Sequence, residues 1–369
     1  MTVQDHSSRS MYYTFGIQRQ ITGGRAHVAQ FIANTAASNW RVWGSSQTVD
    51  PADSHGLIIL PQNVLKRMRV LQGVDVVYSR VEDQIYWSRF SRFACRPWNR
   101  VIGNPLVAWE INAGPEYGLT RGLPETEVAG HLAEMKRLAR DCDVAFCVSE
   151  KIAEYAESKL GIREIVVSPN GSDPDRFSPT VPPVPYLQSC EDRLRVVWIG
   201  GGSIGWHDFD LLHDIAQSLW KHDRGERIRI FVISGDCPRI GDMPPNVTCV
   251  GQRPYDELPH WLSGMHVGLC LYRGGASDYC SPLKLYDYMA SGLPILSTPQ
   301  PQVASVLNAV GQGHAILKRA DEFVDALIQL EHNRDRAREN GKVLRDHLVQ
   351  HCTWKHTVGH ILDEIVRRL

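Results

Sequence analysis

Short apolar runs alternate with longer amphipathic segments along the first half of the chain. The apolar runs predict buried strands near residues 12–16, 57–60, 74–78, 106–109, 144–148 and 164–167. The segments between them predict helices near residues 63–72, 82–95, 123–141 and 149–160. Strands that alternate with helices form mostly parallel sheets with helices on both faces. Because such sheets bind ligands beyond the carboxyl ends of their strands, Arg80, Glu110 and Asn112 are candidate site residues.

The same alternation returns after a proline-rich segment at residues 180–192, which we interpret as a stiff linker. Strands are expected near residues 194–199, 229–233, 247–250, 267–271 and 294–297, and helices near 209–220, 320–347 and 354–369. A chain of 369 residues is long enough for two domains. We therefore predict domains at residues 1–180 and 193–352, a linker at 181–192, and a separate last helix at 353–369.

Composition narrows the function classes. The net charge of −1 gives no reason to expect bulk nucleic-acid binding. Nine scattered cysteines without a Cys-x-x-Cys pair argue against a zinc site or a disulfide framework, and for a reducing cytoplasm. The first ten residues are polar and no apolar run approaches about 18 residues, so neither a secretory signal nor a membrane span is expected.

Two glycine-rich turns lie between a predicted strand and a predicted helix. The pair Gly23-Gly24 brings backbone close to the sheet edge, although a simple turn explains a glycine pair equally well. The loop at residues 200–208, Gly-Gly-Gly-Ser-Ile-Gly-Trp-His-Asp, offers backbone N–H groups that can cradle a diphosphate. The alternative for this second loop is a flexible turn without a ligand.

The most informative stretch is Ser281-Pro-Leu-Lys-Leu-Tyr-Asp-Tyr-Met-Ala-Ser-Gly-Leu-Pro-Ile-Leu-Ser-Thr298. It predicts a short helix that ends at Gly292, with Lys284 and Asp287 three residues apart on one face. A helix N-terminus attracts anions, Lys284 adds a full charge, and Asp287 can accept a hydrogen bond from a sugar hydroxyl. The alternative is an exposed helix with a solvated Lys–Asp pair.

This stretch resembles the donor-binding segment of retaining GT-B glycosyltransferases of family 4. Those enzymes carry Glu-x7-Glu followed by Ala-Met-Ala-x-Gly-x-Pro-Val. Asp287 falls at the second acidic position, which in the family binds the nucleotide ribose, and the first position falls on Tyr279, beside Asp278. The segment Ser168-Pro-Asn-Gly-Ser-Asp-Pro-Asp-Arg-Phe177 resembles the family's Pro-Asn-Gly-Val-Asp…Phe signature, which ends the N-terminal domain. Thr353-Trp-x6-Ile resembles the C-terminal helix that crosses back onto that domain.

The resemblance implies two Rossmann-like, doubly wound α/β domains that face each other across a cleft, the first binding the acceptor and the second the nucleotide sugar. The implied reaction is front-face transfer of a sugar from a UDP- or GDP-sugar to a hydroxyl of a glycan, a lipid-linked sugar or a small natural product. It needs neither a metal nor a cofactor. Donor-binding residues are expected at Gly23, Gly24, Gly200, Gly201, Gly202, Ser203, Arg253, Ser281, Pro282, Leu283, Lys284 and Asp287.

Lys284, His207 and Glu110 are the expected catalytic residues. Relatives carry an Arg and a Lys in the loop at 200–208, and both are missing here. His207 lies near the position of that Lys and can carry a charge if nearby phosphates raise its pKa. Glu110, in an expected loop at residues 109–113, can accept from an acceptor hydroxyl or orient the donor sugar, unless it only caps the loop. In relatives Arg253 lies at the nucleobase slot, where its planar guanidinium can stack on the base.

Two further features leave alternatives open. Arginines recur at helical spacing in residues 86–100, with aromatic residues on another face. Such a helix contacts an anionic membrane surface peripherally, or buries its aromatic side in the core. The missing cations and the degenerate first acidic position also keep open a non-catalytic nucleotide-sugar-binding partner of another glycosyltransferase. A sugar-nucleotide epimerase on the same fold is the other alternative.

Overall fold

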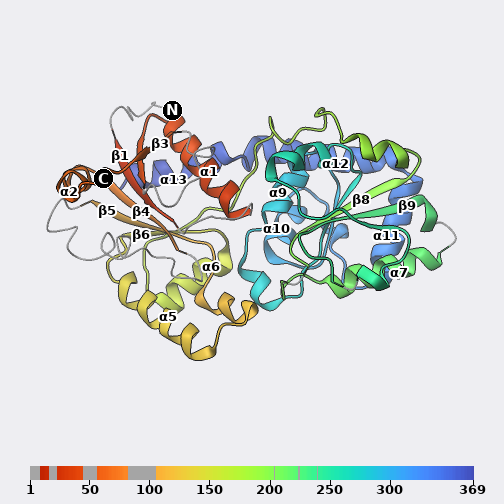
Figure 1. The fold of residues 1–369 in the computed structure, drawn as a ribbon, viewed down its shortest axis with the longest axis horizontal. Coiled ribbons are helices and arrows are strands. Elements are labelled where there is room, and N and C mark those ends of the chain that lie inside the picture. Colours follow the sequence, from red (N-terminus) through yellow and green to blue (C-terminus); the bar gives the residue numbers. More distant parts are fainter. Residues whose placement is uncertain are drawn as a thin grey trace. The chain divides into compact units, whose positions relative to one another are not determined.

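The computed structural model describes residues 9–15, 23–44, 56–81, 105–202, 204–222, 225–238 and 240–369. The chain divides into two compact units (Figure 1). The first unit consists of Met1–Asn170 and Trp354–Leu369, and the second of Gly171–Thr353. The first unit therefore ends before the boundary expected near residue 180. The predicted helices at 82–95 and 86–100 lie outside the described residues.

The first unit contains a parallel sheet in the order β3-β2-β1-β4-β5-β6-β7. Its strands are β1 Ser10–Thr14, β2 Arg41–Gly44, β3 Leu57–Ile59, β4 Val76–Val81, β5 Leu106–Ile111, β6 Val144–Cys147 and β7 Ile165–Val167. Its helices are α1 Gly23–Ala37, α2 Val64–Gln72, α5 Glu125–Ala139, α6 Glu150–Tyr155, which continues as a π-helix over Ala156–Leu160, and α13 Trp354–Val366, with a 3₁₀ segment at Pro115–Arg121. Strands β4 and β5 extend further than predicted, so Arg80 and Glu110 are strand residues that pair directly across the sheet.

The second unit contains a parallel sheet in the order β10-β9-β8-β11-β12. Its strands are β8 Leu194–Ile199, β9 Ile228–Ile233, β10 Val247–Cys249, β11 Val267–Cys270 and β12 Ile295–Ser297. Its helices are α7 Phe209–Lys221, α8 Leu258–Leu262, α9 Leu283–Ala290, α10 Pro301–Ala309, α11 Ala320–His332 and α12 Arg334–His351. The helix predicted over 320–347 is thus two helices, because Asn333 ends the first and its side chain caps the second by accepting from the Arg336 N–H at 3.0 Å.

The residues expected to form a linker belong to the second unit. A 3₁₀ helix at Pro185–Cys190 buries Leu187 and Cys190 in the same core as β8 and β11. This burial explains why the segment packs as part of the unit rather than spanning a gap. Strand β2 was not predicted, because its four residues include the exposed Arg41, although Val42 is fully buried.

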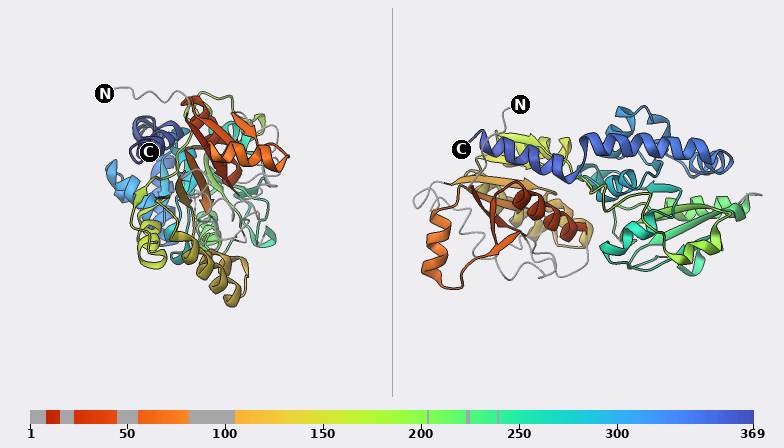
Figure 2. Two further views of the ribbon diagram at one scale, coloured as in Figure 1. Left: turned by 90° about the vertical axis from the view of Figure 1, so that its left-hand side faces the viewer. Right: turned by 90° about the horizontal axis from the view of Figure 1, so that it is seen from above.

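The C-terminal helix α13 packs on the first unit. Val358, Ile361, Leu362 and Ile365 share a core with Phe31 of α1 and Tyr78 of β4. The dark blue α13 can be followed alongside the first unit in Figure 2. Residues more than 300 positions apart in the sequence therefore complete one hydrophobic core.

Close packing positions helix α9 on the second sheet. A Cβ atom at Gly268 of β11 would lie 2.4 Å from the ring of Tyr288, so only glycine admits this buried aromatic side chain. The Tyr288 hydroxyl accepts a hydrogen bond from the Ile199 N–H at 3.0 Å, which ties α9 to the end of β8. Gly292 has a φ of 71° and ends the helix as predicted.

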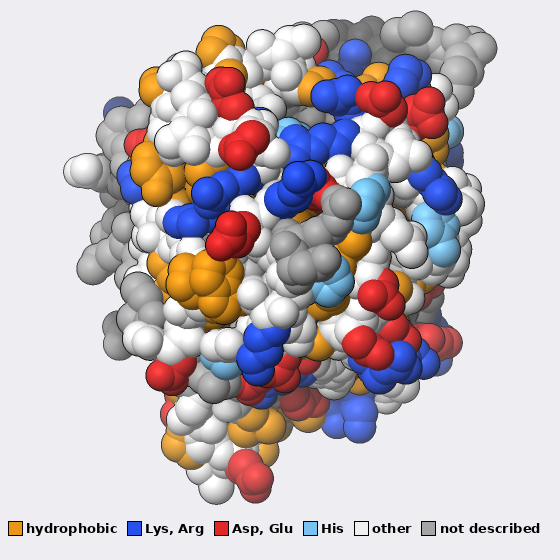
Figure 3. All heavy atoms as spheres, turned by 90° about the vertical axis from the view of Figure 1, so that its right-hand side faces the viewer, with side chains coloured by type: hydrophobic (Ala, Val, Ile, Leu, Met, Phe, Trp, Pro, Cys, Tyr) orange, Lys and Arg blue, Asp and Glu red, His pale blue; other side chains and the backbone are white. Residues whose placement is uncertain are grey.

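The surface of the second unit carries charges of both signs. Lys and Arg side chains lie among Asp and Glu side chains on the face shown in Figure 3. Exposed pairs on α12 include Arg338 with Asp335 and Lys342 with Asp346. Exposed pairs of this kind contribute little stability, so the buried cores dominate the folding free energy. Among the described residues, none of the helices combines the length and apolar character that a membrane span requires.

Candidate functional site

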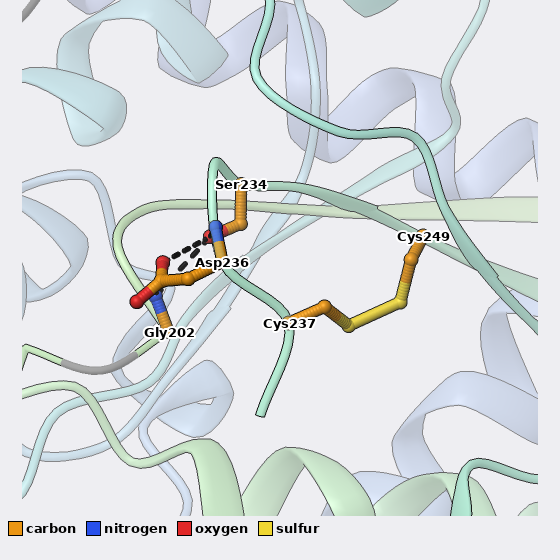
Figure 4. Close-up of a disulfide and its surroundings, with 5 residues drawn as sticks. All are labelled: Gly202, Ser234, Asp236, Cys237 and Cys249. Atoms are coloured by element: carbon orange, nitrogen blue, oxygen red, sulfur yellow. Dashed lines mark hydrogen bonds between the residues drawn. A yellow bond between two sulfur atoms is a disulfide. The ribbon is translucent and has the colours of Figure 1, made fainter. Parts of the chain in front are cut away.

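The glycine loop after β8 lies at the carboxyl edge of the second sheet, where parallel sheets bind ligands. A Cβ atom at Gly200 would lie 2.8 Å from the His207 ring, and one at Gly202 would lie 2.3 Å from Pro238. These glycines are therefore required by tight packing around the loop. The Gly202 N–H donates to Asp236 Oδ1 at 2.8 Å, so this amide is already used within the protein (Figure 4). Ser203 lies outside the described residues.

His207 is buried behind this loop. Its Nδ1 lies 2.8 Å from the Gly201 carbonyl oxygen and therefore carries the proton that the carbonyl accepts. Its Nε2 then accepts from Lys284 Nζ at 3.3 Å. Burial and then the charge of Lys284 lower the pKa of His207 to about 3. The structure thus gives a neutral imidazole that orients Lys284, the opposite of the positive charge considered for His207.

Lys284 projects from the first turn of α9 into an aromatic corner. Its Nζ lies 4.9 Å from the ring centroids of both Trp198 and Tyr272. Burial lowers its pKa to about 8. No carboxylate in the described part of the chain forms an ion pair with it. A partly buried cation held only by ring faces and an imidazole is poised to pair with an anion.

Asp287 occupies the next turn of α9 and is only 4% exposed. Ser172 Oγ donates to its Oδ1 at 2.6 Å, and the Tyr255 hydroxyl donates to the same oxygen at 3.2 Å. Burial raises the pKa of Asp287 to about 7, against hydrogen bonds and the charge of Arg176, which lower it. Because Asp287 is buried and does not pair with Lys284, the alternative of a solvated Lys–Asp pair is wrong.

The remaining donor-side residues have protein partners of their own. Ser281 Oγ lies 3.2 Å from the Tyr286 hydroxyl, and Pro282 and Leu283 form the N-terminal boundary of α9. Arg253 places its guanidinium 5.6 Å from the Trp261 ring centroid and donates to the Val250 carbonyl. The surface that Arg253 was expected to offer to a base is therefore directed at a protein ring.

A disulfide joins Cys237 to Cys249, the last residue of β10 (Figure 4). The expectation that the cysteines are unpaired is wrong for this pair, because the ends of β9 and β10 are neighbours although their cysteines are separated by 12 positions. The cross-link anchors the segment that carries Ser234 and Asp236, and Asp236 accepts from the glycine loop. The disulfide thereby holds in place the segment that hydrogen-bonds to the glycine loop after β8.

Glu110 lies in the first unit and has four partners. It accepts from Arg80 Nη1 at 3.0 Å, Asn112 Nδ2 at 2.7 Å and the Tyr78 hydroxyl at 3.2 Å, and it lies 2.9 Å from His27 Nε2. Burial alone would raise the pKa of Glu110, but the contacts with His27 and Arg80 outweigh it and lower the pKa to about 2. The prediction of Glu110 in a loop is wrong, because the residue is a buried member of β5.

Four residues that contact these carboxylates were not predicted: Tyr78, His27, Ser172 and Tyr255. His27 lies one turn into α1, which begins at Gly23 and Gly24, and its Nδ1 is 2.8 Å from Asn170 Oδ1. Ser172 and Tyr255 reach Asp287 from other segments of the second unit. The position of Ser172, where the family signature has Val, was the one available signal in the sequence.

Comparisons with known proteins agree with this architecture. Residues 210–363 match the family model described as glycosyl transferase-like. The chain is 25% identical over 221 residues to TuaH of Bacillus subtilis (strain 168), which is provisionally named a teichuronic acid biosynthesis glycosyltransferase. That match covers 57% of this chain but only about half, 53%, of the relative's length. Most of the residues that match the family model lie in the second unit.

Solved glycosyltransferase structures match nearly the whole chain. Anabaena HepE in complex with UDP-glucose matches with a TM-score of 0.68 and 12% identity, covering 98% of this chain and all of the other. Sucrose-phosphate synthase from Thermosynechococcus elongatus matches with a TM-score of 0.63 and 15% identity, over 98% of this chain and all of that one. At these identities the likeness concerns the fold, and it confirms the predicted GT-B fold with two parallel-sheet α/β units.

Proposed function

We propose that this protein is a retaining glycosyltransferase of family 4 type, which transfers a sugar from a nucleoside-diphosphate donor to an acceptor hydroxyl. The observation that carries the proposal is the environment of Lys284. Its cation is partly buried and contacts two aromatic rings and a neutral imidazole. A cation in such an environment is stabilised most when an anion binds beside it. The leaving diphosphate is an anion whose negative charge increases during sugar transfer.

The residues around Lys284 bind different parts of the donor. The α9 N-terminus at Leu283 and the glycine loop at Gly201 supply N–H groups for the diphosphate, whereas the Gly200 N–H already donates to the Ile233 carbonyl at 3.2 Å. His207 holds the ammonium in place, and Asp287 receives the ribose. HepE, a fold neighbour, is described in complex with UDP-glucose, which supports a UDP-sugar donor for this chain.

The chemistry follows from retention of configuration at the sugar carbon. The acceptor hydroxyl attacks the face from which the phosphate departs, and the phosphate oxygen takes the hydroxyl proton. In this mechanism Lys284 and the N–H groups stabilise the charge on the leaving diphosphate without a metal ion. A glycan, a lipid-linked sugar or a small natural product supplies the acceptor, in the cytoplasm or at the inner membrane surface.

A nucleotide panel tests the donor site. UDP, GDP, ADP and dTDP are added to the protein, and we expect one of them to raise the melting temperature through binding linkage. Replacing Lys284→Met should remove that increase and lower the turnover of the matching nucleotide sugar by about 10²-fold or more. Lys342→Met is the matched control, because Lys342 is exposed and pairs with Asp346.

The outcomes separate enzyme from binder. No response to any nucleotide would contradict the donor site. A nucleotide response without cleavage of any nucleotide sugar, across glycan and lipid-linked acceptors, would instead identify a non-catalytic partner of another glycosyltransferase. That second function is favoured by one observation, the Gly202 N–H already engaged by Asp236.

A further inference from the structure

The carboxylate of Asp287 has an uneven set of partners. Oδ1 accepts from Ser172 Oγ at 2.6 Å and from the Tyr255 hydroxyl at 3.2 Å, whereas Oδ2 has only a long contact of 3.4 Å with Tyr255. A carboxylate offers about four lone-pair positions. The two on Oδ1 are filled by hydroxyl protons, and those on Oδ2 remain available for an incoming donor group.

Both hydroxyls are themselves held in place. The Ser172 N–H donates to the Cys352 carbonyl at 3.3 Å, which fixes this residue beside the point where the chain enters the second unit. The Tyr255 ring lies 4.8 Å from the Arg176 guanidinium and makes an edge contact with Phe177, the centroids 5.3 Å apart. Residues 172–177 therefore support Asp287 directly and through Tyr255.

We propose that Ser172 and Tyr255 are positioning residues that orient Asp287, so that its Oδ2 is directed toward a ribose hydroxyl of the donor. This inference rests on the proposed donor-binding function. A donor whose sugar lacks both the 2′- and the 3′-hydroxyl would leave the buried Oδ2 without the hydroxyl proton it needs, and an unsatisfied buried polar group is costly.

The charges around Asp287 give the proposal a pH signature. Burial raises its pKa to about 7, and the hydrogen bonds from Ser172 and Tyr255 act in the opposite direction, as does Arg176. Asp173 raises the pKa slightly. Arg345 of α12 directs its guanidinium at backbone carbonyls, including that of Phe177. Removing either hydroxyl should therefore raise the pKa of Asp287 and delay its ionisation to higher pH.

An isosteric pair of variants isolates the hydroxyl. Ser172→Thr and Ser172→Val have nearly the same shape, and only the Thr variant keeps the donor. Tyr255→Phe removes the second donor in the same way. Ser178→Ala is the matched control from the same segment, because the half-buried Ser178 makes its side-chain hydrogen bonds with Thr180 rather than with Asp287 or Tyr255.

The measurement is the ratio of dissociation constants for 2′,3′-dideoxy-UDP and UDP, and for the GDP pair, by titration calorimetry from pH 5.5 to 9. We expect the native protein to prefer the ribonucleotide about 10-fold or more at pH 8, since hydrogen bonds to charged groups contribute about 1.5–3 kcal/mol. The preference should fade as the pH falls below about 7. In Ser172→Val and Tyr255→Phe, the pH at which the preference for the ribonucleotide appears should be higher, and the preference should return near pH 9. In Ser172→Thr and Ser178→Ala, the pH dependence of the preference should be the same as in the native protein.

Three results would overturn the proposal, and they are distinguishable. If Ser172→Val and Tyr255→Phe keep the native transition, the two hydroxyls do not position Asp287. If the native protein binds UDP or GDP without preferring the ribose form, Asp287 does not bind ribose, while the donor site itself stands. If neither nucleotide binds, the proposed function fails together with the inference.

Discussion

The two units each bury one carboxylate near the carboxyl edge of a parallel sheet, and the two carboxylates have opposite surroundings. Glu110 accepts from Arg80 and Asn112 and lies against His27, and its pKa falls to about 2. Asp287 has hydroxyl donors, and its pKa rises to about 7. The Glu110 carboxylate already interacts with cationic and amide groups of the protein, whereas Asp287 has an oxygen that can still accept a hydrogen bond from a ligand.

This contrast separates a structural carboxylate from a binding one. Buried ion pairs hold their partners rigidly and are costly to break. Hydroxyl partners orient a carboxylate without neutralising it, which leaves its charge for a substrate hydroxyl. The cations show the same division, because Arg80 is paired with Glu110 while Lys284 has no carboxylate partner among the described residues.

Breaking the Glu110 cluster should have the largest effect on stability. Glu110→Gln removes the buried carboxylate charge that pairs with Arg80, so we expect the free energy of unfolding to fall by about 3–5 kcal/mol. Urea denaturation followed by tryptophan fluorescence measures the change. The control is Glu154→Gln, which removes an exposed pair with Lys151 and should cost less than about 1 kcal/mol. Equal effects of the two variants would contradict the structural role of Glu110.

Removing the disulfide tests how much this cross-link contributes to the stability of the second unit. Cys237→Ser opens a loop closed over 12 positions, and we expect a loss of about 3 kcal/mol in oxidising buffer. The double variant Cys237→Ser/Cys249→Ser should lose no more than the single one, and dithiothreitol should then have no further effect. Additive losses for the two substitutions would show that the cysteines act independently.

The pH dependence of stability should differ in sign between the two carboxylates. The pKa of Asp287 is raised from 3.8 to about 7, so its contribution is greatest below pH 4 and is lost as the pH rises to about 7. The pKa of Glu110 is lowered from 4.5 to about 2, so its contribution is present above pH 4.5 and is lost as the pH falls to about 2.

Urea denaturation across pH 2–8 measures both trends. Relative to the native protein, Asp287→Asn should gain on the order of 1 kcal/mol or more between pH 4 and 7. The deficit of Glu110→Gln should shrink between pH 4.5 and 2. A constant difference between Asp287→Asn and the native protein would mean that Asp287 has an ordinary pKa.

Within the Glu110 cluster, a smaller effect than that of Glu110→Gln is expected for Asn112, which donates to Glu110 at 2.7 Å. Asn112→Ala removes one hydrogen bond to a charged group but leaves Arg80 and His27 in place, so we expect a loss of about 1.5–3 kcal/mol at most. The same urea titration measures it. A loss as large as that of Glu110→Gln would place the amide, rather than the ion pair, at the centre of the cluster.

Local patterns predicted the second unit well. Strand β8 lies at the predicted residues 194–199, because a run of buried apolar residues has few alternatives. The spacing of Lys284 and Asp287 and the stop at Gly292 likewise follow from helix geometry and backbone conformation. These features depend on neighbours within a few residues, which the sequence displays directly.

Contacts between distant segments could not be predicted in this way. His27, Arg80 and Glu110 meet only because helix α1 lies beside the carboxyl ends of strands β4 and β5. Ser172 and Asp287 are 115 positions apart, and a single Ser in place of a Val gives no hint of its partner. The placement of Glu110 in a loop was wrong for the same reason, since the extent of β5 depends on pairing with β4.

Helix α13 also constrains how the protein is made. Most domains fold on the ribosome in the order of their synthesis. The first unit cannot do so, because the side chains of Val358, Ile361, Leu362 and Ile365 belong to its core. The second unit has its own core within residues 171–353 and can fold before α13 emerges. Of the two units, the one that is synthesised first therefore has the core that is completed last.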